Sequence, residues 1–292
     1  MKEVKTQRRL KIIRNTEDPK SLFKTTTLTP EEILYRLGRP RSLLSTSSKV
    51  EKGLKQGVLT RILYLTSSIY CPASTPSCRA TCLGFTSGRM GYDRATMARD
   101  RRAALYAADT AAFLQLLRED LHQLCYDAET LGLKPACRIN GSSDIPIELL
   151  HPEILSEFAG RVQFYDYTVL YTRMERQAMS AWKRDCGGNS WPTNYHLTFS
   201  AKENNYGRVE RVLKELKSNV AMVFWPDLPA DRTWLGYPVI DGDTNDLRFL
   251  DPSPSIVGLR AKGIAQQDLT GFVVRTDRSA STVPVLNRFN VA

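Results

Sequence analysis

The chain has 292 residues, of which 42% are hydrophobic, and it carries a formal net charge of +10. This apolar content is enough for a sizeable core, which excludes a chain that is disordered throughout. No segment approaches the ~18 consecutive apolar residues of a membrane-spanning helix. No apolar stretch follows the basic start, so we expect a cytoplasmic protein with no secretory signal and no membrane partner.

Residues 1–42 are predicted to form a basic, partly ordered extension of a single domain at 43–292. Residues 1–58 hold 14 Lys or Arg against 6 Asp or Glu, while the rest of the chain is nearly neutral. Such a segment is either a solvated tail or an arm for nucleic acid, and both interpretations stay open. Thr29 and Pro30 predict the start of a short helix that ends before Gly38.

A buried strand is predicted at 61–66, and Cys71, Cys78 and Cys82 follow it in a polar loop. In sheets built from β-α units, ligands bind at the carboxyl ends of the strands. Three thiolates can hold three irons of a [4Fe–4S] cluster and leave one iron open. With a fourth ligand, His196 or Cys186, they would make a zinc site instead. Of these two kinds of site, we favour the iron–sulfur cluster.

Strands and helices then alternate along the chain. Helices are expected at 93–108 and from Thr110 to Gly132, with Arg94, Arg99, Arg101 and Arg102 solvated. A capping box, Thr172 to Glu175, predicts another helix start. The alternation predicts a parallel sheet and an α/β fold: a (β/α) barrel, closed or partial, like a TIM barrel. With 61–66, the predicted strands are 136–140, 162–167, 195–199, 220–224, 237–240, 256–260 and 272–274.

Polar residues at the strand ends are the candidate site, because these ends converge on one mouth of a barrel. Arg138 is expected to point into the barrel and to pair with Asp166, whereas His122 and His151 are expected to be plain surface groups. The expected cofactor-binding residues are Arg138, Asn140, Ser142, Ser143 and Asp144. The expected catalytic residues on the substrate side are Tyr165, Asp166, Tyr167, Arg260 and Lys262.

Several short motifs resemble those of the "gene product 88" family of phage and plasmid proteins, over roughly residues 43–263. The resemblance implies a protein encoded by a bacteriophage or another mobile element. The motifs are the cysteine loop, Leu44-Ser-Thr-Ser-Ser-Lys49 with Gly53, Arg138-Ile-Asn-Gly-Ser-Ser-Asp144, Phe164-Tyr-Asp-Tyr-Thr168, Asp241-Gly-Asp243 with Asp246 and Arg248, and Gly258-Leu-Arg-Ala-Lys-Gly263.

The cysteine loop after the first strand is also similar, more distantly, to that of radical S-adenosylmethionine enzymes. Those enzymes usually space the cysteines Cys-x3-Cys-x2-Cys, whereas this chain has Cys-x6-Cys-x3-Cys. The resemblance implies an iron–sulfur enzyme that holds S-adenosylmethionine at residues 140–144. Its substrate is unknown, and we expect the enzyme to act on or near nucleic acid. The alternatives are a zinc-stabilised, non-enzymatic nucleic-acid-binding protein and a phage replication or modification factor.

Overall fold

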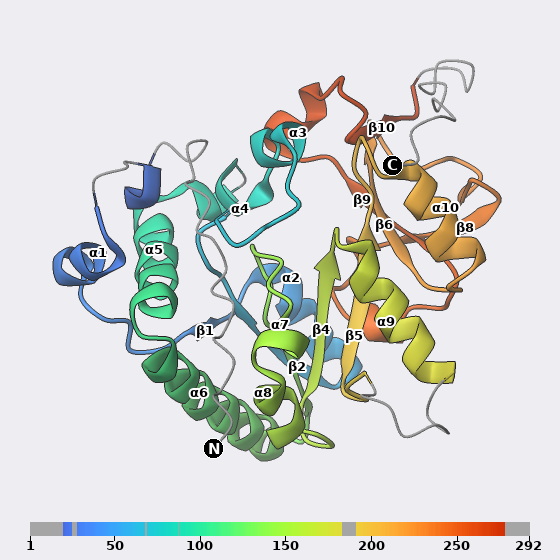
Figure 1. Cartoon of the computed structure of the whole chain (residues 1–292). Helices are drawn as coiled ribbons and strands as arrows, with labels where there is room; N and C mark the ends of the chain where they lie inside the picture. Colours follow the sequence, from blue (N-terminus) through green and yellow to red (C-terminus); the bar gives the residue numbers. More distant parts are fainter. Residues whose placement is uncertain (1–19, 25–27, 68, 87, 183–190, 278–292) are drawn as a thin grey trace, which may run out of the picture.

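A computed structural model describes residues 20–24, 28–67, 69–86, 88–182 and 191–277. They form a mixed α/β fold around one ten-stranded, mostly parallel sheet (Figure 1). None of the helices in these ranges is long and apolar enough to cross a membrane. The basic segment 1–19, predicted as a tail or polyanion arm, lies outside the described residues.

All eight predicted strands are present, and the first begins three residues earlier than predicted. Two short strands that the sequence pattern did not predict, β1 (Leu44–Ser45) and β7 (Thr233–Trp234), pair antiparallel at the sheet edges. The parallel strands are β2 (Val58–Leu63), β3 (Lys134–Arg138), β4 (Gln163–Thr168), β5 (Tyr195–Ser200), β6 (Val220–Trp225), β8 (Tyr237–Asp241), β9 (Ile256–Arg260) and β10 (Val273–Arg275).

The strand order is that of a β/α barrel only in the first half of the sheet. Strands β2 to β6 are neighbours in chain order, but β9 then lies next to β6 and β8 lies beyond it. Strand β10 pairs with Val223–Trp225 of β6, while β5 pairs with Val220–Ala221. Over the described ranges, the path of paired strands runs from β1 to β7 and no pairing closes it into a ring.

The helices begin and end for identifiable reasons. Thr29 caps the first helix, as predicted, and the structure adds a capping box between Thr29 and Glu32. Asp109 rather than Thr110 caps α6, because its carboxylate accepts a hydrogen bond from the amide of Ala112. Thr172 lies inside α9, so the capping box predicted there is wrong.

The α-helices are α1 (Pro30–Leu37), α2 (Ser48–Glu51), α3 (Pro76–Ala80), α4 (Leu83–Thr86), α5 (Asp93–Ala108), α6 (Thr110–Thr130), α7 (Ile147–Leu150), α8 (Pro152–Glu157), α9 (Tyr171–Trp182) and α10 (Tyr206–Lys214). The 3₁₀ turns are η1 (Leu22–Lys24), η2 (Lys52–Gln56), η3 (Gly88–Gly91), η4 (Arg248–Leu250) and η5 (Gly263–Gln267).

The two faces of the sheet are covered by different material. Because side chains alternate along a strand, Phe164 of β4 lies in the main core with helix residues such as Leu117, and we name this the helix face. Tyr165 lies in a small cluster with Leu247 beside η4, and we name this the loop face. The loop face is therefore where polar loops, rather than helices, meet the strands.

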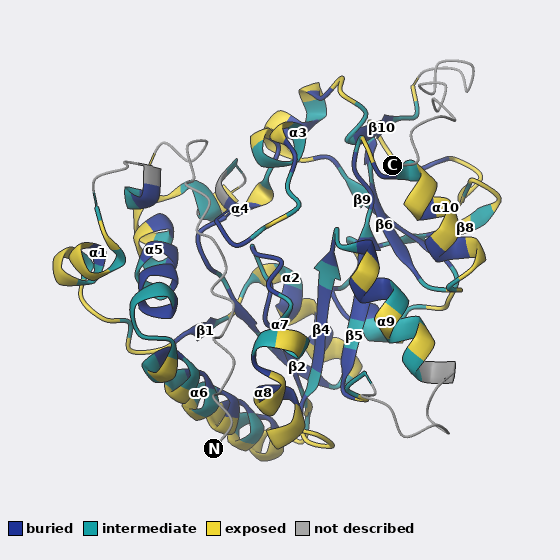
Figure 2. Ribbon diagram, in the orientation of Figure 1, coloured by how far each residue is buried: buried dark blue, intermediate teal, exposed yellow. Residues whose placement is uncertain are grey.

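Helix α5 is more deeply buried than its sequence indicates (Figure 2). Arg99, predicted to be solvated, is 1% exposed and donates to Thr96 Oγ1 at 2.9 Å. His151, predicted to be a surface group, is 6% exposed and shares a hydrogen bond with the hydroxyl of Tyr106. Both predictions are wrong because tertiary contacts enclose the side chains: Met90 of η3 lies 3.8 Å from Arg99 Nη1, and Tyr106 of α5 packs against His151.

Candidate functional site

The cysteine loop follows β2 and lies beside the loop that follows β3 (Figure 1). Thr75 caps α3 by accepting a hydrogen bond from the amide of Cys78, and this fixes Cys78 in the first turn. Cys82 lies four residues further on, and the two thiols interact electrostatically. Cys71 approaches the other loop, with its Sγ 3.9 Å from the carbonyl oxygen of Ser142. All three cysteines are half-buried.

The surroundings of Cys78 favour a protonated thiol. Burial, and then the neighbouring Cys82, raise the pKa of Cys78 to about 12, while the amine of Lys202 opposes this shift. Lys202 is buried at the end of β5 and donates to the carbonyl oxygen of Ala73. In the part of the chain that the structure describes, no three His, Cys, Asp or Glu side chains are grouped closely enough to hold a metal ion. The three sulfur atoms therefore lie on one loop but are not close enough together to bind a metal ion in this arrangement.

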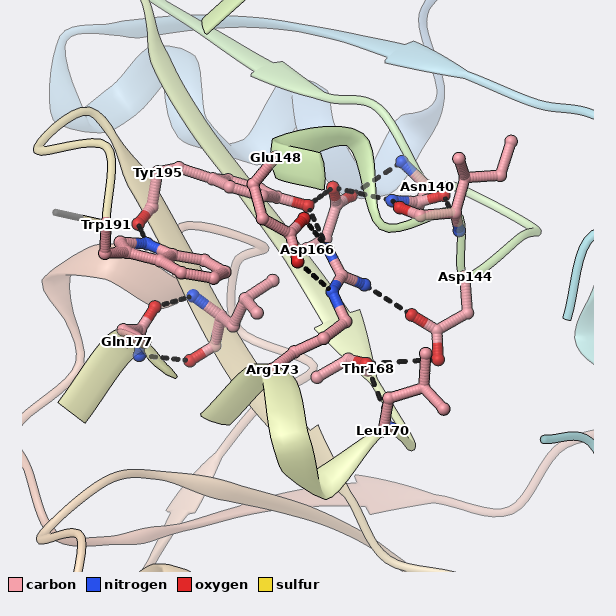
Figure 3. A network of polar contacts seen from close by, with 12 residues as sticks. Asn140, Asp144, Glu148, Asp166, Thr168, Leu170, Arg173, Gln177, Trp191 and Tyr195 are labelled. Atoms are coloured by element: carbon pink, nitrogen blue, oxygen red, sulfur yellow. Dashed lines mark hydrogen bonds and ion pairs between the residues drawn. The ribbon is translucent and has the colours of Figure 1, made fainter. Parts of the chain in front are cut away.

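The loop after β3 is fixed by a buried network on the helix face (Figure 3). Asp166 of β4 accepts hydrogen bonds from the backbone amide of Asn140 at 2.7 Å and from Tyr195 Oη at 2.8 Å. Arg173 of α9 donates to Asp144 at 2.6 Å and to both oxygens of Glu148 at 2.9 Å. Burial raises the pKa of Asp166 to about 6. We name these six residues the Arg173 network.

The predicted Arg138–Asp166 pair is wrong, because the two side chains belong to opposite faces of the sheet. Cys137 is paired with Phe164 in the register of β3 and β4, so Asp166 lies on the helix face with Phe164. Arg138 lies on the loop face and binds Asp246 instead, with Nη1 3.1 Å from Oδ2. Of the predicted cofactor-binding residues, Asn140, Ser143 and Asp144 are buried and hydrogen-bonded within the protein.

Asp246, in the loop after β8, is the centre of a second polar cluster. Its carboxylate is 0% exposed and lies 3.2 Å from Lys49 Nζ as well as close to Arg138. Tyr165 Oη donates to it at 3.3 Å, and the guanidinium of Arg138 lies over the ring of Tyr167 at 4.7 Å. We name these five residues the Asp246 centre.

The charges of the Asp246 centre are mutually stabilised. Burial alone would favour the neutral acid, but Arg138 and Lys49 hold the pKa of Asp246 below its ordinary value. Burial opposes the charge of Lys49 as well, yet Tyr167 and Asp246 keep its pKa above the ordinary value. Burial and the charge of Asp246 raise the pKa of Tyr165 well above its usual range, so its hydroxyl stays protonated. The centre therefore holds two cations, one carboxylate and a permanent hydroxyl donor.

Several buried polar atoms around the Asp246 centre have no hydrogen-bond partner among the described residues. Arg138 Nε and Tyr167 Oη belong to the centre itself, while His196 Nε2 and Thr198 Oγ1 come from the neighbouring β5. Burial, and then the charge of Arg248, lower the pKa of His196 to about 4, so its ring is neutral at pH 7. Unpaired buried polar groups are costly and often mark functional positions. This feature separates the Asp246 centre from the fully paired Arg173 network.

The structure does not bring Arg260 and Lys262, predicted to be catalytic, into the Asp246 centre. Arg260 pairs with Asp241 at 2.9 Å and with Asp227 at 2.8 Å. Lys262 pairs with Asp243 at 2.8 Å. These ion pairs join the end of β9 and the loop after it to the end of β8 and to the loops that follow β6 and β8, which indicates a structural role.

Sequence reasoning missed Lys49, Arg173, Glu148 and Lys202 as site or supporting residues. Arg173 and Glu148 stand in helices, where charged side chains are usually solvated. Lys49 lies in a polar segment before β2, and only the tertiary fold brings it to Asp246, 197 positions away in the sequence. His196 proves to be a loop-face residue of β5, and Cys186 lies outside the described residues.

Comparison with known proteins gives one match. A family model for gene product 88 matches residues 41–276, which is most of the chain and includes the cysteine loop and both polar clusters. No curated protein and no solved structure matches the chain. By its sequence over this range, the chain belongs to the gene product 88 family.

Proposed function

We propose that the protein is an iron–sulfur enzyme, with a [4Fe–4S] cluster on the cysteine loop and a polar, anionic substrate at the Asp246 centre. The observation that carries the proposal is the position of three half-buried cysteines on one loop, after β2 of a parallel sheet. Ligands of such sheets collect at this end of the strands. Arg138, Tyr165 and Tyr167 occupy the neighbouring strands β3 and β4.

The donor chemistry of the loop fits such a cluster, whereas its arrangement is not preassembled. Thiolates are the usual ligands of iron–sulfur clusters, and three of them leave one iron open for a substrate or cosubstrate. Cys78 and Cys82 already lie close enough to interact. Cys71 would have to leave the carbonyl oxygen of Ser142 to join them. A bound cluster would supply one-electron chemistry.

The protein's own residues would bind and orient the substrate. Arg138 and Lys49 offer positive charge and hydrogen-bond donors, and a guanidinium can bind a carboxylate or phosphate through two parallel hydrogen bonds. The hydroxyl of Tyr165 stays protonated and donates. Arg138 Nε and Tyr167 Oη are buried polar atoms that a substrate could pair.

S-adenosylmethionine is the proposed cosubstrate, through the distant likeness to radical enzymes. Its candidate contact is Ser142, which is only half-buried and whose hydroxyl oxygen can still accept a hydrogen bond while it donates to the carbonyl oxygen of Leu65. Asn140, Ser143 and Asp144 are buried and already used inside the Arg173 network and the turn beside it. Titration of the anaerobic protein with S-adenosylmethionine should give saturable binding that Ser142→Ala weakens. Heat release that stays at the dilution baseline would remove the cosubstrate from the proposal.

The cluster is tested on protein purified without oxygen. We expect a brown solution that absorbs near 400 nm and contains about four irons per chain. Alanine at Cys71, Cys78 or Cys82 should each abolish colour and iron, whereas Cys125→Ala, the matched change in α6, should keep both. A colourless protein with one tightly bound zinc per chain would contradict the iron proposal and favour the zinc-stabilised alternative.

A further inference from the structure

Four arginines line a hollow on the surface beside α5, and none of its lining residues belongs to the cysteine loop or to the Asp246 centre. The hollow has a volume of about 420 Å³ and is lined by the segment after α1 and by one side of α5. The segment supplies Arg39 and Arg41, and the helix supplies Arg101 and Arg102. Helices α1 and α5, which frame this corner, lie side by side (Figure 1).

The positive charge of the hollow is only partly neutralised. Arg39 pairs with Asp109 at 3.1 Å, and its side chain is still 61% exposed. Arg41 is exposed, and no hydrogen bond or ion pair joins its side chain to another described residue. Asp120 is another nearby carboxylate, but it already accepts hydrogen bonds from the backbone amides of Leu43 and Leu44, at N···O distances of 2.6 and 2.7 Å. Four guanidinium groups therefore face two carboxylates that are already engaged.

The two arginines of α5 make weak contacts and retain donors. Arg101 Nη1 donates to the carbonyl oxygen of Leu37 at 3.4 Å, and its Nε has no partner in the described structure. Arg102 Nε reaches the carbonyl oxygen of Ser42 at 3.5 Å. Burial lowers the pKa of Arg102 to about 10; Asp120 opposes the shift, while Arg101 and Arg99 add to it. An anion in the hollow would relieve this repulsion.

We propose that the arginine hollow, formed by Arg39, Arg41, Arg101 and Arg102, binds backbone phosphates of nucleic acid. Guanidinium forks match phosphate oxygens in geometry as well as charge. Tyr35, on the helix that leads into Arg39, is 92% exposed and offers a ring on which a base can stack. Arg39 and Arg41 also belong to residues 1–58, where the excess of basic residues is concentrated.

The test measures binding of the full chain to fluorescein-labelled single-stranded and duplex DNA by anisotropy, at several salt concentrations. Arg39→Gln/Arg41→Gln should weaken binding at least about tenfold near 0.1 M salt and flatten the salt slope by roughly 1.8, because each phosphate contact contributes about 0.9. Arg176→Gln/Arg208→Gln, which removes the same charge from exposed positions of α9 and α10, should leave both values unchanged. Both variants change exposed side chains, so the fold should persist.

Three outcomes would overturn the proposal. They are equal loss of affinity in both double variants, binding of inorganic phosphate with no binding of either DNA, and binding to vesicles of anionic lipid with no binding of DNA. Neither variant touches the cysteine loop, so iron content should be the same in both. A failure of this proposal is thereby distinguishable from a failure of the proposed iron–sulfur function.

Discussion

The Arg173 network and the Asp246 centre lie on opposite faces of the same two strands, and they differ in how completely their polar atoms are paired. In the Arg173 network, the guanidinium reaches two carboxylates and a tyrosine hydroxyl. At the Asp246 centre, Arg138 Nε and Tyr167 Oη are buried without a partner among the described residues. Complete pairing is typical of a structural network, and unpaired buried donors indicate a place for a ligand. The difference supports our proposal that one face serves stability and the other face serves substrate binding.

The largest effect is expected when the side chain in the middle of the Arg173 network is removed, and this variant tests the comparison most strongly. Arg173→Met leaves Asp144 and Glu148 buried without their partner, so we expect a loss of about 3–5 kcal/mol in the free energy of unfolding. Urea titration followed by circular dichroism measures it. Arg176→Met changes an exposed arginine of the same helix and should stay within about 0.5 kcal/mol of the native protein. Equal stability of the two variants would refute the structural assignment.

The loop face should respond to acid through His196. Its folded pKa of about 4 lies below the ordinary value near 6.5. As pH falls from 6.5 to 4, the unfolded chain takes up a proton that folded His196 does not, so the folded state loses stability. We expect the native protein to lose up to about 3 kcal/mol more than His196→Gln between pH 7 and 4.

Comparing the two proteins at each pH cancels the contribution of Asp166 and Asp251, whose pKa values are raised to about 6 and which therefore act in the opposite direction. Parallel stability curves for the native protein and His196→Gln would show that His196 does not titrate below its ordinary range.

The variants with the smallest expected effects compare the two faces most directly, because each variant removes one tyrosine hydroxyl, from the helix face in one case and from the loop face in the other. Tyr195→Phe deletes a hydroxyl that bonds to Asp166 and Arg173, and should cost about 1–3 kcal/mol. Tyr167→Phe deletes an unpaired hydroxyl but keeps the ring beneath Arg138, so stability should change by less than about 0.5 kcal/mol. Thermal unfolding of the two variants side by side is sufficient. A larger loss in Tyr167→Phe than in Tyr195→Phe would reverse the assignment of the two faces.

The sequence was informative where local chemistry decides the structure. Thr29, Pro30 and Glu32 specify the start of α1, and the apolar runs locate all eight parallel strands. The faces were harder to predict: Arg138 was assigned the right face, but Asp166 was assigned to the same one, because the register of β4 depends on neighbours far along the chain.

The site depends even more on long-range packing. No local pattern connects Lys49 with Asp246, or shows that Arg99 will be buried. The change of strand order after β6 is also invisible in a pattern that records only where strands begin and end.

One contact of the loop face bears on how the protein folds. Lys52 of η2 donates to the carbonyl oxygen of Asp243 across 191 positions of sequence, and Leu247 packs against Gly53 of the same turn. Closing a chain segment of that length costs roughly 5 kcal/mol in entropy, and such contacts make folding slow. A chain still emerging from the ribosome cannot form the Asp246 centre until the segment around residue 246 is made. If this centre binds the substrate, as we propose, it can do so only after most of the polypeptide has been synthesised.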